Sequence, residues 1–401
     1  MRAKLAPSAS PPRSRRRVGR SSPSKPPAGQ RGGHSEPRLL IGLMSGTSLD
    51  GVDAVLASIS GNAPPVLLQA NHRAFAPALR EELLALTQPG DNEIERAGRA
   101  SNQLSQLYAE AVSGLLEAGR IAPAAVAAIG AHGQTVRHRP EAGFTVQLGA
   151  PALLAELTGI AVVADFRSRD LAAGGHGAPL VPAFHAAVFA ADHPRAVVNI
   201  GGIANLSSLP ASATQGLVRG FDCGPGNLLL DAWIQRHLGL AFDRDGAWGA
   251  GGRVDPGLLA RLLADPYFEQ TPPKSTGRER FNPDWLDARL TGREAPQDVQ
   301  ATLAALTATA IARAVERWAP ECVDLLVCGG GARNAALMRS LAALCGERTV
   351  ASTEAHGIAP EHVEALAFAW LAHAHLERLA GNLPEVTGAR GPRVLGALYP
   401  A

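Results

Sequence analysis

Two glycine-rich turns, each between two apolar runs, stand about 150 residues apart in this chain. They lie in residues 39–56 and 196–209, and each segment reads as a strand, a turn of Gly with Ser, Thr or Asn, and a second strand. Such a turn presents backbone N–H groups and hydroxyls with no bulky side chain in front of them. The repetition predicts two similar halves, each contributing one phosphate-binding hairpin to a shared cleft.

Between and after these hairpins, hydrophobic periodicity alternates between the helical and the strand pattern. It predicts helices over residues 77–86, 93–118, 151–158, 226–238, 298–317, 335–344 and 360–379, and strands over 126–130, 144–148, 160–164 and 323–328. Residues 243–285 read as a polar stretch rich in Gly, Pro and Trp. This alternation predicts an α/β fold whose strands are buried between helices.

The length of 401 residues exceeds what one hydrophobic core usually organises, so two domains are expected. We assign residues 38–164 and 375–401 to domain I and residues 165–374 to domain II, with the end of the chain returning to the first domain. Residues 1–37 are rich in Pro, Ser and Arg, lack an apolar stretch, and are predicted to form a disordered basic tail.

Charge and cysteine usage exclude several classes of protein. Residues 1–37 hold nine Lys and Arg against one acidic residue, a net +8, so the overall +2 leaves −6 on the rest. An acidic body of this kind is not typical of a nucleic-acid-binding domain. The four cysteines lack Cys-x-x-Cys spacing, so the sequence suggests neither a zinc ribbon nor a disulfide framework. Such cysteines fit a protein of the reducing cytoplasm. No uncharged apolar run approaches the roughly 18 residues of a membrane span.

The first hairpin carries the clearest candidates for phosphate binding. Ser45, Thr47, Ser48 and the amides around Gly46 would hold phosphates, and Asp50 would order Mg²⁺ through water. The alternative is an ordinary turn, since the same residue types dominate turns. Three glycines at 329–331 join a strand to a helix, where they favour either approach of a nucleotide or tight packing.

Asp222 lies between a predicted strand and a predicted helix, where a carboxylate would serve as a general base or as a helix-start residue. His132 and Gln134 follow the strand over 126–130, at a cleft edge. Glu364 lies on an otherwise apolar helix, where an acid is costly without a partner or a function.

Arginines in residues 165–170 precede a glycine run and suit an anionic or polyhydroxyl ligand, or structural salt bridges. The polar segment 267–282 contains Lys274 and Arg278, which would close over substrate or nucleotide. The alternative for this segment is a solvated loop.

Seven sequence blocks together resemble the anhydro-N-acetylmuramic acid kinases of the actin-like sugar-kinase superfamily, over residues 39–401. The blocks are MSGTSLDGVD (44–53), GAHGQTVRH (130–138), DFRSRDLAAGGHGAPLVPAFH (165–185), NIGGIANLS (199–207), GFDCGPGNLLLDAW (220–233), PKSTGRERFN (273–282) and EALAFAWLAHAHLERLAGNLPEVTGA (364–389). The basic tail lies outside the family pattern, and His176 stands where the family more usually has Gln.

The resemblance implies two actin-like, ribonuclease H-like domains with a nucleotide and substrate cleft between them. It implies that ATP and water convert 1,6-anhydro-N-acetylmuramic acid into N-acetylmuramic acid 6-phosphate and ADP, in cell-wall recycling. Asp222 would activate the water, and Mg²⁺ would accompany ATP, with Asp50 as its candidate ligand. The expected partner is a small sugar, with no nucleic acid and no membrane, in a cytoplasmic protein of a family whose members are commonly dimers.

The glycine turns and the resemblance together assign the contacts within this cleft. ATP would contact Gly46, Thr47, Ser48, Leu49, Asp50, Gly51, Val52, Asp53, Gly201, Gly202, Gly329, Gly330 and Gly331. The sugar would contact Arg169, Glu364, His132 and Gln134. Two alternatives stay open from the sequence: another sugar kinase of the superfamily that opens no ring, and a sugar-sensing regulator built on a kinase fold.

Overall fold

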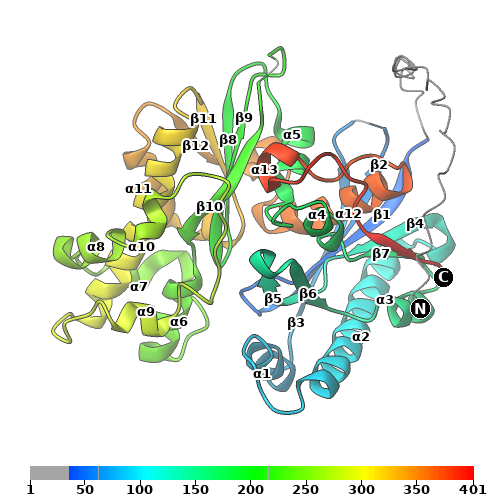
Figure 1. The fold of residues 1–401 in the computed structure, drawn as a ribbon, viewed down its shortest axis with the longest axis horizontal. Helices are drawn as coiled ribbons and strands as arrows, with labels where there is room; N and C mark the ends of the chain where they lie inside the picture. The colour runs from blue at the N-terminus through cyan, green and yellow to red at the C-terminus, as the bar shows by residue number, and fades with distance from the viewer. Residues whose placement is uncertain (1–35, 62, 215) are drawn as a thin grey trace, which may run out of the picture.

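The computed structural model describes residues 36–61, 63–214 and 216–401. The predicted basic tail over residues 1–37 therefore lies outside the described residues, except for its last two. Figure 1 shows two large β-sheets in separate halves of the molecule, with α5 (Val181–Phe189) and α12 (Val363–Leu376) between them.

The first sheet has the strand order β13-β7-β4-β1-β2-β3. Its centre is the antiparallel hairpin of β1 (Arg38–Met44) and β2 (Gly51–Ile59), in which Met44 faces Asp53. The other strands are β3 (Val66–Ala74), β4 (Val126–Ala131), β7 (Val162–Ala164) and β13 (Ala397–Tyr399). β13 pairs with β7, so the end of the chain returns to the first sheet, as predicted.

Successive side chains of β1 and β2 enter different cores, as the two-residue period of a strand requires. Ile41 and Leu43 pack with α1 (Pro77–Ala85), α2 (Glu93–Gly119) and α3 (Pro151–Thr158). Leu40 and Val55 pack with α12 on the opposite face. The sheet is therefore covered by helices on both faces.

The second sheet has the order β10-β9-β8-β11-β12. Its strands are β8 (Arg195–Ile200), β9 (Ile203–Leu209), β10 (Arg219–Pro225), β11 (Asp324–Cys328) and β12 (Thr349–Ser352). One face packs against α10 (Pro296–Trp318) and α11 (Ala335–Leu344). On the other face, Val197 and Leu326 join the core that contains α5 and α12. The second predicted hairpin is thus β8–β9.

The remaining elements are α4 (Ser168–Ala172), α6 (Leu228–Leu238), α7 (Ala247–Ala250), α8 (Pro256–Leu263), α9 (Pro283–Asp287), α13 (Pro384–Thr387) and the hairpin of β5 (Gln134–Arg139) and β6 (Phe144–Leu148). Helices α6, α8, α9 and α10 share a separate apolar cluster. The polar stretch at 243–285 thus contains α7, α8 and the start of α9, which the sequence pattern did not identify. No helix among the described residues is long and apolar enough to cross a membrane.

Helix α12 approaches the first sheet closely because glycines face it. A Cβ atom on Gly42 of β1 would overlap the carbonyl oxygen of Ala365, and one on Gly130 of β4 would overlap that of Phe368. Only glycine leaves room for the helix backbone at these two positions. The predicted boundary at residues 374/375 places this helix in domain II, and that boundary stays a prediction.

We expect Gly42→Ala to lower the free energy of unfolding by about 1–3 kcal/mol, since the added methyl group forces α12 away from β1. The matched control is Gly98→Ala in α2, where a Cβ meets no atom within 4 Å. That change should leave stability unchanged or raise it by up to about 1 kcal/mol. Urea unfolding of both variants tests this, and equal stabilities would contradict the packing argument.

Candidate functional site

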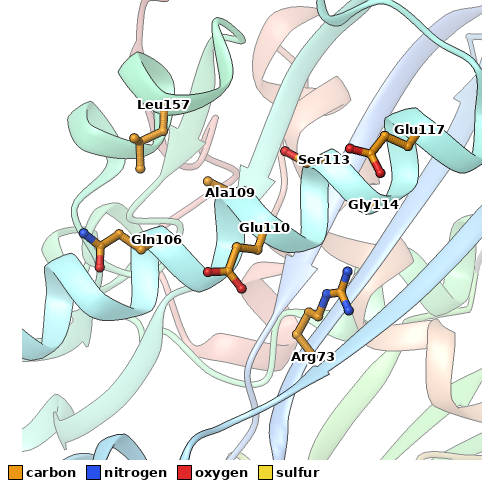
Figure 2. A pocket seen from close by; sticks show the side chains of 8 residues that line it. All are labelled: Arg73, Gln106, Ala109, Glu110, Ser113, Gly114, Glu117 and Leu157. Carbon is orange, nitrogen blue, oxygen red and sulfur yellow. The ribbon is translucent and has the colours of Figure 1, made fainter.

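A cavity of about 570 Å³ is lined by segments from both halves of the molecule. The β1–β2 turn and the segment after β4 line one side, and the β8–β9 turn, β10 and residues 275–279 line the other, with Glu364 of α12 also in the lining. A depression of about 540 Å³ lies outside α2, beside Arg73 and Glu110 (Figure 2). None of the predicted site residues lines that depression, whereas several of them line the first cavity.

The tips of the two hairpins meet at this cavity. A Cβ on Gly202 would lie 2.7 Å from Oγ1 of Thr47, so the two turns are in contact across the two halves. Gly46, Thr47, Ser48, Gly201 and Gly202 all line the cavity. The structure therefore brings together the two turns that the sequence predicted to share a cleft.

Ser45, also expected to hold phosphates, has a hydroxyl that is fully buried and engaged. Its Oγ donates to the carbonyl oxygen of Gly133 (2.9 Å) and lies 2.8 Å from the Tyr108 hydroxyl. A serine hydroxyl has one proton, so Tyr108 is the donor in the second bond. The side chain of Ser45 supports the turn from below, and its backbone lines the cavity.

The other residues predicted around the first turn do not line the cavity. The side chains of Leu49 and Val52 are buried in the first core, and a Cβ on Gly51 would overlap the backbone of Arg73. Asp50 is exposed and accepts a 2.8 Å hydrogen bond from Ser48, whereas Asp53 bonds to Nδ1 of His72 (2.8 Å).

The glycines at 329–331 lie behind the second turn, against the end of β8. Cβ atoms on Gly329 and Gly331 would overlap Asn199 and Ile200, respectively, and Gly330 is exposed. Packing thus accounts for two of these glycines, and none of the three lines the cavity. Their contact with a nucleotide stays a prediction.

Asp222 is held inside the cavity by residues of the segment that follows. Its Oδ2 accepts a hydrogen bond from the Thr276 N–H (2.9 Å), and its backbone oxygen accepts one from the Tyr267 hydroxyl (2.7 Å). The sequence suggested that Asp222 follows a strand, but it lies within β10, next to an irregularity in the β9–β10 pairing. Burial raises the pKa of Asp222 to about 7, although the Thr276 N–H and the Arg167 guanidinium both favour the carboxylate. A carboxylate with such a pKa is suited to accept a proton near neutral pH.

Arg167 and His132 form a second group in the cavity. Arg167 donates through Nε and Nη2 to Nε2 of His132 (3.3 and 3.0 Å) and through Nη1 to the Gly177 oxygen (2.8 Å). Burial, and then the charge of Arg167, lower the pKa of His132 to about 3. His132 is therefore neutral, with Nδ1 donating to the Ser45 oxygen (3.3 Å) and Nε2 accepting.

Glu364 reaches the cavity from α12. Burial raises the pKa of Glu364, and a hydrogen bond to Asn199 opposes this effect. Gln134 donates from Nε2 to the Gly46 oxygen (3.1 Å), so it supports the first turn directly.

Comparison with known proteins identifies the family. Residues 38–401 match the sequence model of the family described as anhydro-N-acetylmuramic acid kinase. The chain belongs to this family.

Two relatives of that name illustrate the similarity. The anhydro-N-acetylmuramic acid kinase of Bordetella petrii is 57% identical over 369 residues, covering 91% of this chain and 97% of that protein. That of Variovorax paradoxus is 59% identical over 372 residues, covering 90% and 99%. The chain is therefore a kinase, a phosphotransferase that uses ATP and acts on a small sugar.

Solved structures are more distant. The activator of 2-hydroxyisocaproyl-CoA dehydratase from Clostridium difficile with bound ADPNP is 12% identical, with a TM-score of 0.44, and the comparison covers 84% of this chain and 96% of that chain. A ROK family glucokinase from Streptomyces griseus in complex with glucose and AMPPNP is 12% identical, with a TM-score of 0.37, covering 83% and 98%. The two large sheets, each covered by helices, confirm the predicted α/β class and its division into two halves.

Within this kinase, the position of Arg169 differs from the expectation. Arg169 lines a separate depression with His375, Arg378 and Leu398, and it does not line the central cavity. Arg167 takes that position because α4 starts at Ser168, and residues two apart on a helix point about 200° apart. His176 likewise lies outside the cavity lining, and its N–H donates to the Thr387 oxygen (2.8 Å).

Sequence reasoning gave no role to Asn199, Asn205 or Thr276. Among the described residues, Oδ1 of Asn205, Oγ1 of Thr276 and Oε1 of Gln134 are buried without a hydrogen-bond partner, and all three residues line the cavity. Buried polar atoms that no protein group satisfies point to contacts with a ligand. Asn199 and Asn205 both belong to the sequence block NIGGIAN, which could have suggested them.

The raised pKa of Asp222 predicts how stability depends on pH. The pKa of Asp222 is about 7 in the folded protein and about 4 in the unfolded chain. As the pH rises through this interval, the unfolded chain ionises first, so the free energy of unfolding falls. Asp222→Asn removes this penalty. The free energy of unfolding of the variant, taken relative to that of the unmodified protein, should therefore increase by about 2–3 kcal/mol when the pH is raised from about 5 to about 8.5. Urea unfolding at both pH values measures this gain, and parallel stabilities would show that Asp222 has an ordinary pKa.

Proposed function

We propose that the chain converts 1,6-anhydro-N-acetylmuramic acid, ATP and water into N-acetylmuramic acid 6-phosphate and ADP, in the recycling of cell-wall peptidoglycan. One observation carries the proposal for the site. Asp222, a carboxylate with a raised pKa, lies in the same cavity as the two glycine turns and Glu364. Ring opening and phosphoryl transfer need a base and a phosphate site this close together.

Asp222 serves as the base that activates water. Among the described residues, the Thr276 N–H is the donor to its carboxylate and occupies Oδ2, so Oδ1 is available to a water molecule. The water oxygen attacks the anomeric carbon while its proton passes to Asp222. The bond from that carbon to O6 breaks, and its electron pair stays on O6.

O6 then attacks the γ-phosphorus of ATP, the bond to the bridging oxygen breaks, and ADP leaves with that electron pair. Asp222 returns its proton to solvent. The N–H groups at Gly46, Thr47 and Ser48 and at Gly201 and Gly202 face the phosphates. These dipoles are fixed before the reaction, so they stabilise the developing charge without reorganisation.

The sugar lies between Asp222, Glu364 and Arg167. The free oxygens of Asn205 and Gln134 accept hydrogen bonds from its hydroxyl or amide groups, and the buried Glu364 carboxyl contacts it from α12. Arg167 keeps a positive charge beside both carboxyls, and the neutral His132 holds its guanidinium in place.

Mg²⁺ would neutralise charge on the ATP phosphates, and Asp50 is the residue that would hold it. Asp50 is exposed, and its Oδ1 accepts a hydrogen bond from the Ser48 hydroxyl. In the described part of the chain, no cluster of three acidic, His or Cys residues could form a closed metal site. This fits Mg²⁺, which keeps several waters and is bound by one or two carboxylates together with phosphates. The expected homodimer, the cytoplasmic location and the absence of nucleic-acid and membrane partners stay predictions.

Turnover in ¹⁸O-labelled water tests the reaction itself. With Mg-ATP and 1,6-anhydro-N-acetylmuramic acid, the label should appear at the anomeric oxygen of a 6-phosphorylated product, read by mass spectrometry. Phosphorylation of ordinary N-acetylated sugars alone would instead indicate a sugar kinase that opens no ring. No turnover on either sugar would favour the sugar-sensing regulator.

Asp222→Asn should lower kcat by about 10²–10⁴-fold, because the amide cannot accept the proton of the attacking water. ATP affinity, measured by calorimetry, should stay within about threefold, because the phosphate turns lie on other segments. Asp192→Asn is the matched control, since its side chain is 99% exposed. Turnover of Asp222→Asn close to that of the control would remove Asp222 as the base.

A further inference from the structure

The segment 273–282 connects the proposed base to the opposite half of the molecule. Thr276 donates its N–H to Asp222, and two residues later Arg278 donates from Nε (2.9 Å) and Nη2 (2.5 Å) to the carbonyl oxygen of Thr47. Thr47 belongs to the glycine turn of the first sheet, whereas segment 273–282 packs against β10 of the second. One short segment thus touches both the base and the proposed phosphate site.

Arg278 differs from neighbouring arginines in lacking a carboxylate partner. Arg280 and Arg289 both pair with Asp265, whereas among the described residues no carboxylate lies within ion-pair distance of Arg278. The guanidinium of Arg278 donates to one neutral carbonyl oxygen, and its Nη1 has no hydrogen-bond partner in the part of the chain that the structure describes. A partly buried guanidinium without a counter-ion is costly unless a ligand supplies the negative charge.

A second unpaired arginine lies at the same turn. Arg80 of α1 donates from Nε to the carbonyl oxygen of Leu49 (3.0 Å), two residues after Thr47, and forms no ion pair with any described residue. Burial lowers the pKa of Arg278, and the charge of Arg80 lowers it further, while Asp231 opposes both. The turn therefore lies between two guanidinium groups, where an anion is favoured.

We propose that Arg278 contacts the γ-phosphoryl group of ATP and stabilises its negative charge during transfer to O6. This proposal rests on the phosphate site proposed above. Arg278 stays protonated throughout: the bond between the γ-phosphorus and the bridging oxygen breaks, the bond to O6 forms, and no proton leaves the guanidinium. Thr276 of the same segment donates to Asp222, so one segment positions both the proposed base and the proposed phosphate contact.

A purely structural role is the competing interpretation, in which Arg278 only fastens the two halves through Thr47. The two roles differ in what they stabilise. A fastening residue stabilises every nucleotide complex equally, whereas a phosphate-contacting residue favours the complex that carries a planar, charged γ-phosphate mimic.

The test compares Arg278→Ala and Arg278→Lys with the unmodified enzyme, with sugar substrate present. Calorimetry measures the affinity for ADP alone and for ADP with aluminium fluoride. For Arg278→Ala we expect ADP affinity within about threefold, affinity for ADP with aluminium fluoride lowered about 100-fold or more, and kcat lowered about 10²–10⁴-fold. Arg278→Lys should fall between, since it keeps the charge and loses the two-point donor geometry.

Added methylguanidine should restore part of the turnover of Arg278→Ala, an effect that a fastening role does not produce. The matched control is Arg236→Ala, which removes an exposed arginine paired with Asp287 and should behave like the unmodified enzyme. Equal losses of affinity for both nucleotide complexes, or near-normal turnover of Arg278→Ala, would overturn the proposal.

Gly46→Val separates a failure of this inference from a failure of the phosphate site itself. A branched side chain at Gly46 should block ATP and ADP binding, because the nucleotide phosphates need the space in front of the turn. Normal ATP binding by Gly46→Val would show that the phosphate site is wrong, and Arg278 would lose its role with it. Lost binding by Gly46→Val together with near-normal turnover of Arg278→Ala would overturn only the role of Arg278.

Discussion

The close approach of α12 to the first sheet is the constraint on which the site depends. Gly42 and Gly130 let the helix backbone lie against β1 and β4, and its other side packs into the core that also contains Val197 of the second sheet. The helix therefore links both halves and sets the distance between them. Because the two glycine turns extend from β1 and β8, that distance brings their tips into contact and carries Glu364 into the cavity.

Burial gives the groups in the cavity their chemical properties. It raises the pKa values of Asp222 and Glu364 and lowers that of His132. The charge of Arg167 acts in the direction that keeps the two carboxyls ionisable and the imidazole neutral. The same buried environment thus provides a proton acceptor in Asp222, a neutral hydrogen-bond acceptor in His132 and a fixed positive charge in Arg167.

The segment 273–282 shows how a loop acquires function from its two neighbours. The Lys274 carbonyl oxygen accepts a hydrogen bond from the Asp222 N–H, which holds the segment against β10, and the preceding Tyr267 donates its hydroxyl to the Asp222 oxygen. Lys274, expected to close over substrate, is instead buried, with Nζ bonded to the Tyr267 oxygen (3.1 Å). Arg278 is the residue of this segment that reaches the opposite half, so the solvated-loop alternative is wrong.

The sequence by itself determined the elements that depend on local pattern and turn chemistry. The two hairpins, the long helices and the glycine turns were predictable because hydrophobic period and glycine placement act over a few residues. Only the tertiary structure decided which polar side chains enter the cavity. Arg167 lines the cavity and Arg169 does not, because of where α4 begins. Leu49 and Val52 of the first hairpin lie in the core, and Thr276 bonds to Asp222 across 54 residues of chain. Such choices depend on helix phase and on packing between distant segments, and neither leaves a signal in the local order of residues.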